Sequence, residues 1–430
     1  MDLSARLEQV IRDGQEGPLE PLIPRDVRLW SLPGKADAVV GMRRVGKTSL
    51  LLAHMADRVA AGHPRRNLAY VNFEDDRLAG LQTEDLHLVH EAALRLGEPE
   101  GERWLYLDEV QNVPGWERFV RRMVETPGQR VAVTGSSSRL LSTEIATSLR
   151  GRSLTVELFP FGFREALRHR GIPEPDRLPT STLAQAALER AFDRWFETGG
   201  FPEAQDLDAR ARSALMRSYV DVVILRDVVE RHGVTNVAAL RALTRRLLAA
   251  PAGRFTVNRF TNDLKSQGIP ASRELVDGLF QHLEDAFLVG SVPLATDSAQ
   301  KRAVNPRKVY PIDTALVPTL TRSEMRGHRL ETVVYVELRR RGYDVGWART
   351  RSDFEVDFVA RHPEREPLLV QVAWDLSEPG TRERELRALA EAADEHDIDR
   401  AHLITRSTRE SMRAGRCEVE VWPAWWWLLA

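Results

Sequence analysis

The sequence predicts an α/β fold in which a parallel β-sheet is covered by helices on both faces. Between residues 36 and 160, short apolar runs such as DAVVG and RWLYLDE alternate with helical stretches, and several runs are too continuous to be half-exposed strands. This alternation is typical of buried parallel strands joined by helices. The segment GMRRVGKT also connects the first apolar run to a helix, as a phosphate-binding loop does. Both observations favour a P-loop sheet early in the chain.

The composition limits the class of protein. A chain of 430 residues is long enough for about two to four domains of roughly 100–200 residues each. The formal net charge of −2 excludes a broadly basic surface, so contact with nucleic acid requires a local basic patch. Cys417 is the only cysteine, which excludes an intrachain disulfide and suits a reducing cytoplasm. Because no apolar run spans a membrane and the charged start lacks a signal-peptide core, we expect a cytoplasmic protein without a membrane partner.

The segment from Gly41 to Thr48 matches the pattern G-x-x-x-x-G-K-[ST] at every position. Glycines let the backbone curl so that consecutive N–H groups face the β- and γ-phosphates. The ammonium of Lys47 then bridges those phosphates, the hydroxyl of Thr48 binds Mg²⁺, and the helix from Ser49 directs its positive end at the anion. A glycine-rich turn without a ligand is the alternative. We expect ATP and Mg²⁺ here, with nucleotide contacts from Gly41, Met42, Arg43, Arg44, Val45, Gly46, Lys47, Thr48 and Ser49.

Two adjacent carboxylates end the apolar run RWLYLDE. ATP hydrolysis needs one carboxylate near Mg²⁺ and another to orient the attacking water. We expect Asp108 to hold the metal together with Thr48, and Glu109 to polarise the water. An apolar run that ends in DE is a weak signal by itself, because a surface turn also explains it. The phosphate loop earlier in the chain gives the pair its weight.

Further catalytic candidates follow in the next two apolar runs. In QRVAVTGSSS, the hydroxyls of Thr134 and Ser136 lie where a γ-phosphate would be sensed, although a helix cap also explains the later serines. Arg150 and Arg152 precede the run SLTVELFP. Such arginines can reach the γ-phosphate of a neighbouring subunit, which would make the protein a homo-oligomer. An exposed basic pair is the alternative.

The second half of the chain has a different texture. The Pro-rich stretch GIPEPDRLPTST begins at residue 171 and is followed by helical sequence to about residue 250. Residues 255–295 then predict two helices separated by a turn, and an apolar strand, which is the outline of a winged helix. The second of these helices carries Glu274 and Asp277, and this acidity does not suit a helix in a DNA major groove.

Several motifs together resemble a known family. GMRRVGKTSLL, LDEVQNVPGWERF, FETGGFPEA, NPRKVYPIDTAL and EVDFV occur in an order and spacing similar to those of prokaryotic AAA+ ATPases related to archaeal-type ATPases. The resemblance covers nearly the whole chain, and it implies that Pro24 and Arg25 lie near the adenine of ATP. The expected domains are an AAA+ P-loop core at 1–170, a helical lid at 171–250, a winged helix at 251–312 and a restriction-endonuclease-like domain at 313–430.

The implied nuclease-like domain departs from an active nuclease. Such a site needs a helix carboxylate, an Asp on a hairpin, and (Asp/Glu)-x-Lys on the next strand. Glu331 and Asp357 meet the first two requirements, but Gln371 replaces the third carboxylate and Ala373 replaces the lysine. A neutral amide binds Mg²⁺ weakly and alanine cannot assist proton transfer. We therefore expect a nuclease-inactive domain with a structural or DNA-holding role.

The basic stretch QKRAVNPRKVY is the best candidate for phosphate contact near the wing. Its basic residues suit contact with a nucleic-acid backbone and a solvated loop about equally. They are Lys301, Arg302, Arg307 and Lys308.

Three functions suit these residues. The first is an oligomeric AAA+ ATPase that couples Mg²⁺-dependent ATP hydrolysis to DNA binding or remodelling, such as the processing of branched DNA. The second is a nucleotide-dependent switch or scaffold that recruits a protein partner. The third, an ATP-gated nuclease, is disfavoured by Gln371 and Ala373. All three require a nucleotide at the phosphate loop.

Overall fold

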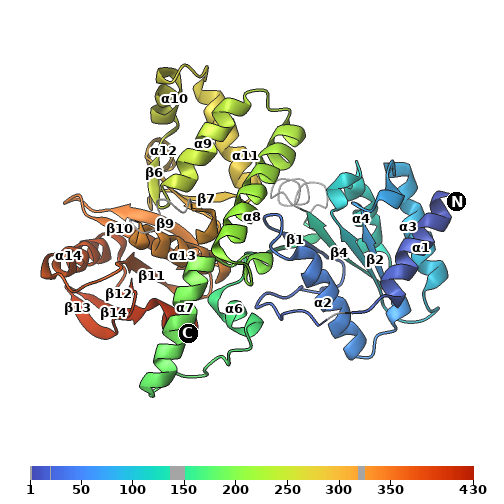
Figure 1. The fold of residues 1–430 in the computed structure, drawn as a ribbon, viewed down its shortest axis with the longest axis horizontal. Coiled ribbons are helices and arrows are strands. Elements are labelled where there is room, and N and C mark those ends of the chain that lie inside the picture. The colour runs from blue at the N-terminus through green and yellow to red at the C-terminus, as the bar shows by residue number, and fades with distance from the viewer. Residues whose placement is uncertain (1, 20, 136–150, 318–324) are drawn as a thin grey trace. The chain divides into compact units, whose positions relative to one another are not determined.

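The computed structural model describes residues 2–19, 21–135, 151–317 and 325–430 (Figure 1). The chain divides into two compact units, residues 1–158 and 159–430. Within the described residues, no helix combines the length and apolar character that crossing a membrane requires.

The first unit contains a parallel sheet in the strand order β2-β3-β4-β1-β5 (Figure 1). Every described pairing in it is parallel, which confirms the predicted α/β fold. Helix α1 packs against α3 and β2, and α2 and α4 pack against β4. The strands are β1 (Ala36–Val40), β2 (Leu68–Asn72), β3 (Arg103–Asp108), β4 (Gln129–Gly135) and β5 (Ser153–Glu157), and the helices are α1 (Leu3–Glu16), α2 (Lys47–Ala60), α3 (Leu86–Leu96) and α4 (Trp116–Glu125).

Strand β1 reads as a continuous apolar run because it is a central strand. It pairs with β4 on one side and β5 on the other, and all five of its residues are buried. Asp37 is its one charged residue, and its carboxylate accepts hydrogen bonds from the backbone N–H groups of Trp30 at 2.8 Å and Ser31 at 3.1 Å. Burial raises the pKa of Asp37, although these two bonds oppose the shift.

Parallel strands place their carboxyl ends at one edge of the sheet. Asn72 at the end of β2 is in register with Asp108 at the end of β3, and Val40 at the end of β1 is in register with Gly135 at the end of β4. This edge therefore gathers the phosphate loop and the first predicted carboxylate. The opposite edge holds Arg152, whose carbonyl oxygen accepts a hydrogen bond from the N–H of Ala36 at 2.8 Å.

The second unit begins with helices. They are α6 (Phe163–His169), α7 (Thr182–Thr198), α8 (Ala209–Val222), the π-helical η6 (Val223–Glu230) and α9 (Val237–Ala249). Helix α7 ends at Thr198 and is followed by Gly199, whose φ of 79° and contact with Asp313 exclude a larger side chain. The N–H of Gly200 donates to Asp313 at 2.7 Å, so the GGF and IDT segments are held together.

A three-stranded sheet, made in the described part by β6, β8 and β7 in that order, follows the helices. All its pairings are antiparallel. Helix α11 buries Val276, Leu279, Phe280 and Leu283. Its Glu274 is exposed, whereas Glu284 accepts a hydrogen bond from the hydroxyl of Ser291 on β7 at 2.6 Å. The elements are β6 (Gly253–Phe255), α10 (Val257–Ser266), α11 (Arg273–Asp285), β7 (Val289–Val292), α12 (Ala299–Val304) and β8 (Arg307–Pro311).

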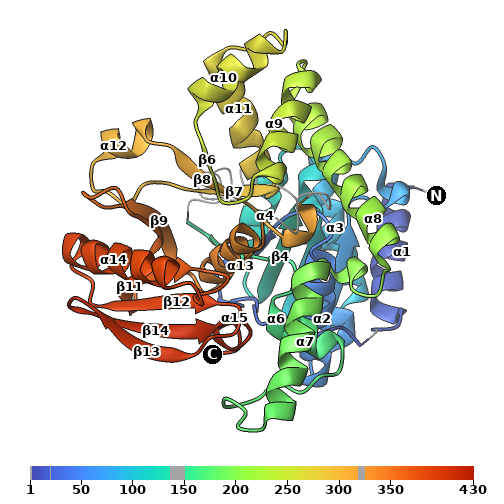
Figure 2. The same ribbon diagram turned by 60° about the vertical axis from the view of Figure 1, so that its left-hand side comes forward.

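The chain ends in a mixed sheet, with the described strands in the order β13-β14-β12-β11-β10-β9. Helix α14 covers one face of this sheet (Figure 2), where Val359 and Leu369 lie in the same apolar cluster as Leu389. On α13, Tyr335 stacks on Phe358. The elements are α13 (Arg326–Arg340), β9 (Asp344–Arg349), β10 (Glu355–His362), β11 (Arg365–Val372), α14 (Pro379–His396), β12 (Arg400–Thr405), β13 (Glu410–Ala414), β14 (Cys417–Pro423) and α15 (Ala424–Trp427).

Candidate functional site

The phosphate loop is shaped by two glycines. Gly41 has a φ of 147°, and a Cβ at this position would overlap the carbonyl oxygen of Leu158. Gly46 has a φ of 98° and caps the start of α2. Both conformations are ones that side-chain-bearing residues rarely adopt, so the loop requires glycine at both ends. The N-terminus of α2 lies directly behind the loop, as an anion site requires.

Lys47 is folded into this loop. Its ammonium donates hydrogen bonds to the carbonyl oxygens of Gly41 and Met42, both at 3.1 Å, and the residue is only 5% exposed. Arg25 lies against the same loop, because its guanidinium donates to the carbonyl oxygen of Val45 at 2.8 Å. The structure thus brings two cationic side chains to the backbone that the sequence predicts to cradle phosphates.

Asp108 is the centre of a hydroxyl network at the carboxyl edge of the sheet. Its Oδ2 accepts hydrogen bonds from Thr48 at 2.7 Å and from Tyr70 at 2.8 Å. Its Oδ1 accepts one from Thr134. Burial and the adjacent Asp108 charge raise the pKa of Tyr70, so the phenol stays a donor. Because a hydroxyl and a carboxylate oxygen are the ligands that Mg²⁺ prefers, Thr48 and Asp108 form a fitting pair for it.

Glu109 has an unusual backbone conformation. Its φ of 51° and ψ of 44° are left-handed, which costs roughly 1–2 kcal/mol for a residue with a side chain. Its N–H donates to the Thr134 hydroxyl at 2.9 Å, and its carboxylate accepts from Gln111 at 2.5 Å. Strained residues of this kind cluster at functional sites. This left-handed turn directly follows Asp108, at the carboxyl end of β3.

The structure brings most of the predicted nucleotide-site residues together and separates one. Arg152 lies at the opposite edge of the sheet from its own phosphate loop and forms an ion pair with Glu125. Ser136 and Arg150 lie outside the described residues. The residues that meet at the carboxyl edge are Arg25, Gly41, Met42, Arg43, Arg44, Val45, Gly46, Lys47, Thr48, Ser49, Asp108, Glu109 and Thr134, and Pro24 precedes Arg25.

Sequence reasoning missed Tyr70 and Gln111. Tyr70 lies on β2, the strand next to β3, and reaches Asp108 from 38 residues earlier in the chain. The available signal was its place near the carboxyl end of an apolar run in the predicted parallel sheet. Gln111 lies two residues after Glu109, so its proximity was available from the sequence, but its bond to the carboxylate depends on the left-handed turn.

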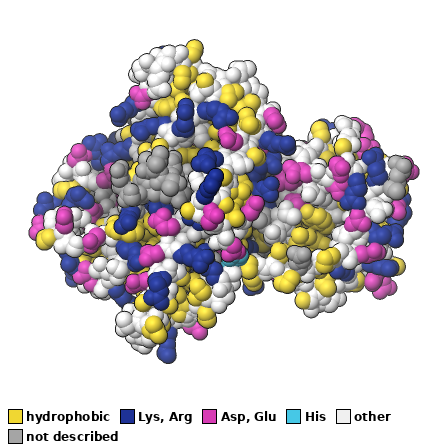
Figure 3. Space-filling model, in the orientation of Figure 1, with side chains coloured by type: hydrophobic (Ala, Val, Ile, Leu, Met, Phe, Trp, Pro, Cys, Tyr) yellow, Lys and Arg dark blue, Asp and Glu magenta, His cyan; other side chains and the backbone are white. Residues whose placement is uncertain are grey.

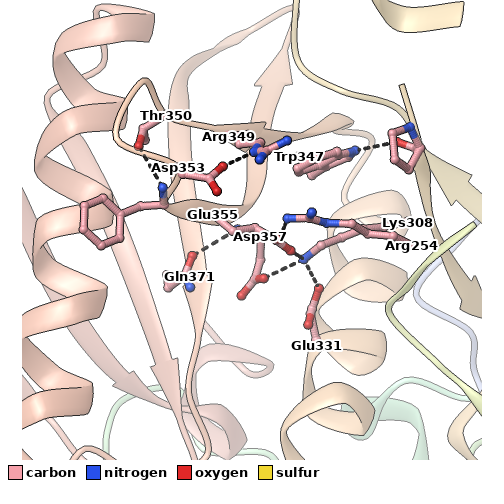
Figure 4. Close-up of polar contacts among 12 residues, drawn as sticks. Arg254, Lys308, Glu331, Trp347, Arg349, Thr350, Asp353, Glu355, Asp357 and Gln371 are labelled. Atoms are coloured by element: carbon pink, nitrogen blue, oxygen red, sulfur yellow. Dashed lines mark hydrogen bonds and ion pairs between the residues drawn. The ribbon is translucent and has the colours of Figure 1, made fainter. Parts of the chain in front are cut away.

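A second polar cluster lies in the C-terminal part of the chain (Figure 4). Glu331 on α13 and both Glu355 and Asp357 on β10 surround the ammonium of Lys308 on β8. Burial, and then the charge of Asp357, raise the pKa of Glu331, whereas the charge of Lys308 opposes this shift. Burial opposes the charge on Lys308, but the three carboxylates outweigh it and raise the pKa of Lys308. A cavity of about 640 Å³ opens beside these residues.

The structure corrects the interpretation of Lys308 as part of an exposed basic stretch. Neither of the two expected environments, phosphate contact or a solvated loop, applies to it, because the residue is 2% exposed and paired with carboxylates. The physical reason is that β8 faces α13 and β10, whose acidic residues need a cation. Lys301 and Arg302 lie on the exposed face of α12, as a solvated loop or phosphate contact requires.

Gln371 lies on β11 and Ala373 directly follows this strand, and both line the cavity beside the Lys308 cluster. The Gln371 side-chain oxygen accepts a hydrogen bond from the N–H of Asp357 at 3.0 Å, and its nitrogen donates to Glu385 on α14 at 2.6 Å. The amide thus links β10 to α14. In the part of the chain that the structure describes, no group of three or more His, Cys, Asp or Glu residues is arranged to hold a metal ion.

Comparison with known proteins assigns domains to both regions. Residues 34–167 match the family model described as an AAA domain, and residues 322–413 match a model described as a restriction endonuclease. Residues 189–326, between them, match a domain of unknown function, DUF8612. The chain therefore has an AAA-type ATPase domain and a C-terminal domain similar to restriction endonucleases.

Two proteins are similar in sequence over most of this chain. The uncharacterized protein MJ1544 of Methanocaldococcus jannaschii is 31% identical over 447 residues, which cover 100% of this chain and 96% of that protein. An uncharacterized protein of Haemophilus influenzae is 26% identical over 344 residues, covering 79% of this chain and 82% of its own length.

Solved structures show weaker likeness. The Walker-type ATPase PABY2304 of Pyrococcus abyssi has a TM-score of 0.38 and 15% identity, with 73% of this chain and 93% of that chain covered. The ORC1 protein of Aeropyrum pernix, solved in complex with DNA, has a TM-score of 0.28 and 16% identity, with 75% and 93% covered. These scores are too low to establish a shared arrangement over the whole chain.

The full-length similarity to MJ1544, the AAA domain and the restriction-endonuclease-like domain agree with the resemblance that the motifs predicted. The chain belongs to the family of prokaryotic AAA+ ATPases, related to archaeal-type ATPases, that carry a C-terminal restriction-endonuclease-like domain.

Proposed function

We propose that the protein hydrolyses ATP with Mg²⁺ and acts as a homo-oligomer. The observation that carries the proposal is the meeting of Lys47, Thr48, Asp108 and Glu109 at one edge of the sheet. Lys47 and the loop N–H groups bind the phosphates, while Thr48 and Asp108 hold Mg²⁺, which neutralises charge on the phosphates when bound. Glu109 orients and polarises the attacking water.

We further propose that hydrolysis is coupled to DNA binding or remodelling. The elements β6, α10, α11, β7 and β8 follow the order of a winged helix, which supports the predicted domain at 251–312. The restriction-endonuclease-like domain is of a class that handles DNA. The bonds of Gln371 to Asp357 and Glu385, together with Ala373, support a domain without nuclease activity.

A nucleotide-dependent switch that recruits a protein partner is the second candidate. Basic and acidic side chains lie interspersed on the face that Figure 3 shows, across both units, and Lys308 is withdrawn from the basic stretch near the wing. A mixed surface of this kind suits a protein partner at least as well as a nucleic-acid backbone.

One experiment separates these functions. The ATPase rate and the oligomer size are measured with and without double-stranded, single-stranded and branched DNA. For the DNA-coupled ATPase we expect turnover to rise several-fold with single-stranded or branched DNA, and to lose this stimulation as salt increases because phosphate contacts weaken. A turnover rate and oligomer size indifferent to all DNA forms would reject DNA coupling and favour the switch.

Substitution of Arg152 tests whether the subunits of a homo-oligomer complete each other's nucleotide sites. Because Arg152 lies at the edge of the sheet away from its own phosphate loop, a catalytic role for it would have to be at a neighbour's nucleotide. We expect Arg152→Ala to bind ATP normally but to lose turnover by on the order of 10³-fold. Mixing it with Glu109→Gln subunits, which keep Arg152, should restore part of the activity. Arg95→Ala, which removes another ion-paired arginine of the first unit, is the control and should turn over normally. Failure of every mixture to recover activity counts against a trans-acting arginine.

A further inference from the structure

The ammonium of Lys308 lies at the convergence of three carboxylates. Its Nζ is 2.8 Å from an oxygen of Glu331, 2.6 Å from one of Glu355 and 2.8 Å from one of Asp357 (Figure 4). The Lys308 side chain is 3% exposed. Three ammonium hydrogens thus meet three acceptors, which satisfies the donor capacity of a buried lysine.

The carboxylates are also held from other sides. The oxygen of Glu331 that faces Lys308 accepts a hydrogen bond from Tyr310 at 2.7 Å. The second oxygen of Asp357 accepts one from the N–H of Val372 at 2.9 Å. The second oxygen of Glu355 pairs with Arg254 on β6. The cluster is therefore a fixed ion-pair arrangement with a single cation at its centre.

A restriction-endonuclease-like fold implies a divalent cation at carboxylates of this kind, but the residues present do not fit one. Mg²⁺ binds oxygen at roughly 2.0–2.1 Å and needs near-octahedral ligands. The point where the carboxylates converge is held by a lysine nitrogen, whose charge would repel a metal beside it. Gln371, the third position of the nuclease pattern, has its side-chain oxygen on a backbone N–H and its nitrogen on Glu385.

We propose that the ammonium of Lys308 occupies the position of a divalent metal in this cluster and neutralises its carboxylates. The inference does not depend on ATP hydrolysis. Lys308 and Arg254 both come from the three-stranded sheet, whereas Glu331, Glu355 and Asp357 come from α13 and β10. The cations thereby fasten that sheet to the C-terminal domain. Withdrawing Lys308 would leave buried carboxylates without a counter-charge, which is strongly unfavourable.

The proposal is tested by Mn²⁺ binding to the full-length protein without nucleotide, measured by titration calorimetry. The wild type and Asp357→Asn should bind the same number of Mn²⁺ ions, because the cluster takes none. Lys308→Met should gain one site per chain, and Lys308→Met/Asp357→Asn should lose that site again. A wild-type Mn²⁺ site that disappears in Asp357→Asn would overturn the proposal, as would a folded Lys308→Met variant that gains no site.

Thermal unfolding gives an independent readout. We expect Lys308→Met to lower Tm by on the order of 5–10 °C, since it leaves buried carboxylates unpaired. Millimolar Mn²⁺ should restore most of this loss in Lys308→Met but not in the double variant. Lys301→Met, the same substitution at an exposed residue of α12, should change neither Tm nor Mn²⁺ binding. If Lys308→Met does not fold, the comparison of wild type with Asp357→Asn still decides. If Mn²⁺ also restored the Tm of the double variant, the proposed site would be contradicted.

Discussion

Lys47→Ala is expected to abolish tight ATP binding. In the proposed site, the lysine ammonium would bridge the β- and γ-phosphates through charge-assisted hydrogen bonds, each worth roughly 1.5–3 kcal/mol. Loss of two such bonds corresponds to an affinity lower by about 10²–10⁴-fold. Lys47 is buried in the loop, with its ammonium on the carbonyl oxygens of Gly41 and Met42, so the substitution removes a cation from within the loop itself. Calorimetric titration with ATP and Mg²⁺ measures the change directly.

The matched control for Lys47→Ala is Lys35→Ala. Lys35 lies directly before β1, the strand that leads into the phosphate loop. Its ammonium donates a hydrogen bond to the carbonyl oxygen of Gly151, at the edge of the sheet away from the loop. Its removal should leave ATP affinity unchanged. Equal ATP affinities of Lys47→Ala and the wild type would remove the phosphate-loop assignment, provided that both unfold at similar temperatures.

Glu109→Gln is expected to bind ATP as tightly as the wild type and to trap it. The amide has nearly the same shape as the carboxylate, and its oxygen can still accept the hydrogen bond from Gln111. It cannot polarise the attacking water as a carboxylate does, and positioned acid–base groups contribute about 10²–10⁴-fold to a rate. Single-turnover hydrolysis of prebound ATP should therefore slow by that factor. Both the affinity and the rate are needed, because only their combination separates binding from chemistry.

Glu117→Gln, in the first turn of α4, is the control for Glu109→Gln. It makes the same chemical change on the same unit, at a residue to which we assign no part in the nucleotide site, and it should bind and hydrolyse ATP normally. A wild-type single-turnover rate in Glu109→Gln would show that this residue does not activate the water. Loss of ATP binding in Glu109→Gln would instead indicate a role in the ground state.

The site at the sheet edge was largely predictable because its parts are local. Gly41 to Thr48 are consecutive, and Asp108 and Glu109 follow a strand whose direction is fixed by the parallel sheet. Tyr70 was not predictable at the same level, because its bond to Asp108 requires the order and register of two neighbouring strands.

The environment of Lys308 could not be predicted from the sequence. Its sequence neighbours are basic, which is typical of an exposed stretch, and its partners Glu331 and Asp357 lie 23 and 49 residues later. Nothing in the spacing brings these residues together before β8, α13 and β10 are packed. The sequence shows Gln371 in place of a carboxylate and Ala373 in place of a lysine. It does not show that Lys308 packs against the remaining carboxylates.

The contact between Gly199–Gly200 and Asp313 also governs how the chain can be divided for biochemistry. Asp313 is 8% exposed, and it caps the segment after α7 from 113 residues later in the chain. A fragment that begins at residue 313 would lack these glycines, so Asp313 would lose its partner. It would also lack Lys308, so the carboxylates on α13 and β10 would lose their counter-charge. Residues 159–430 form one compact unit, and a fragment with these bounds keeps both sets of partners together.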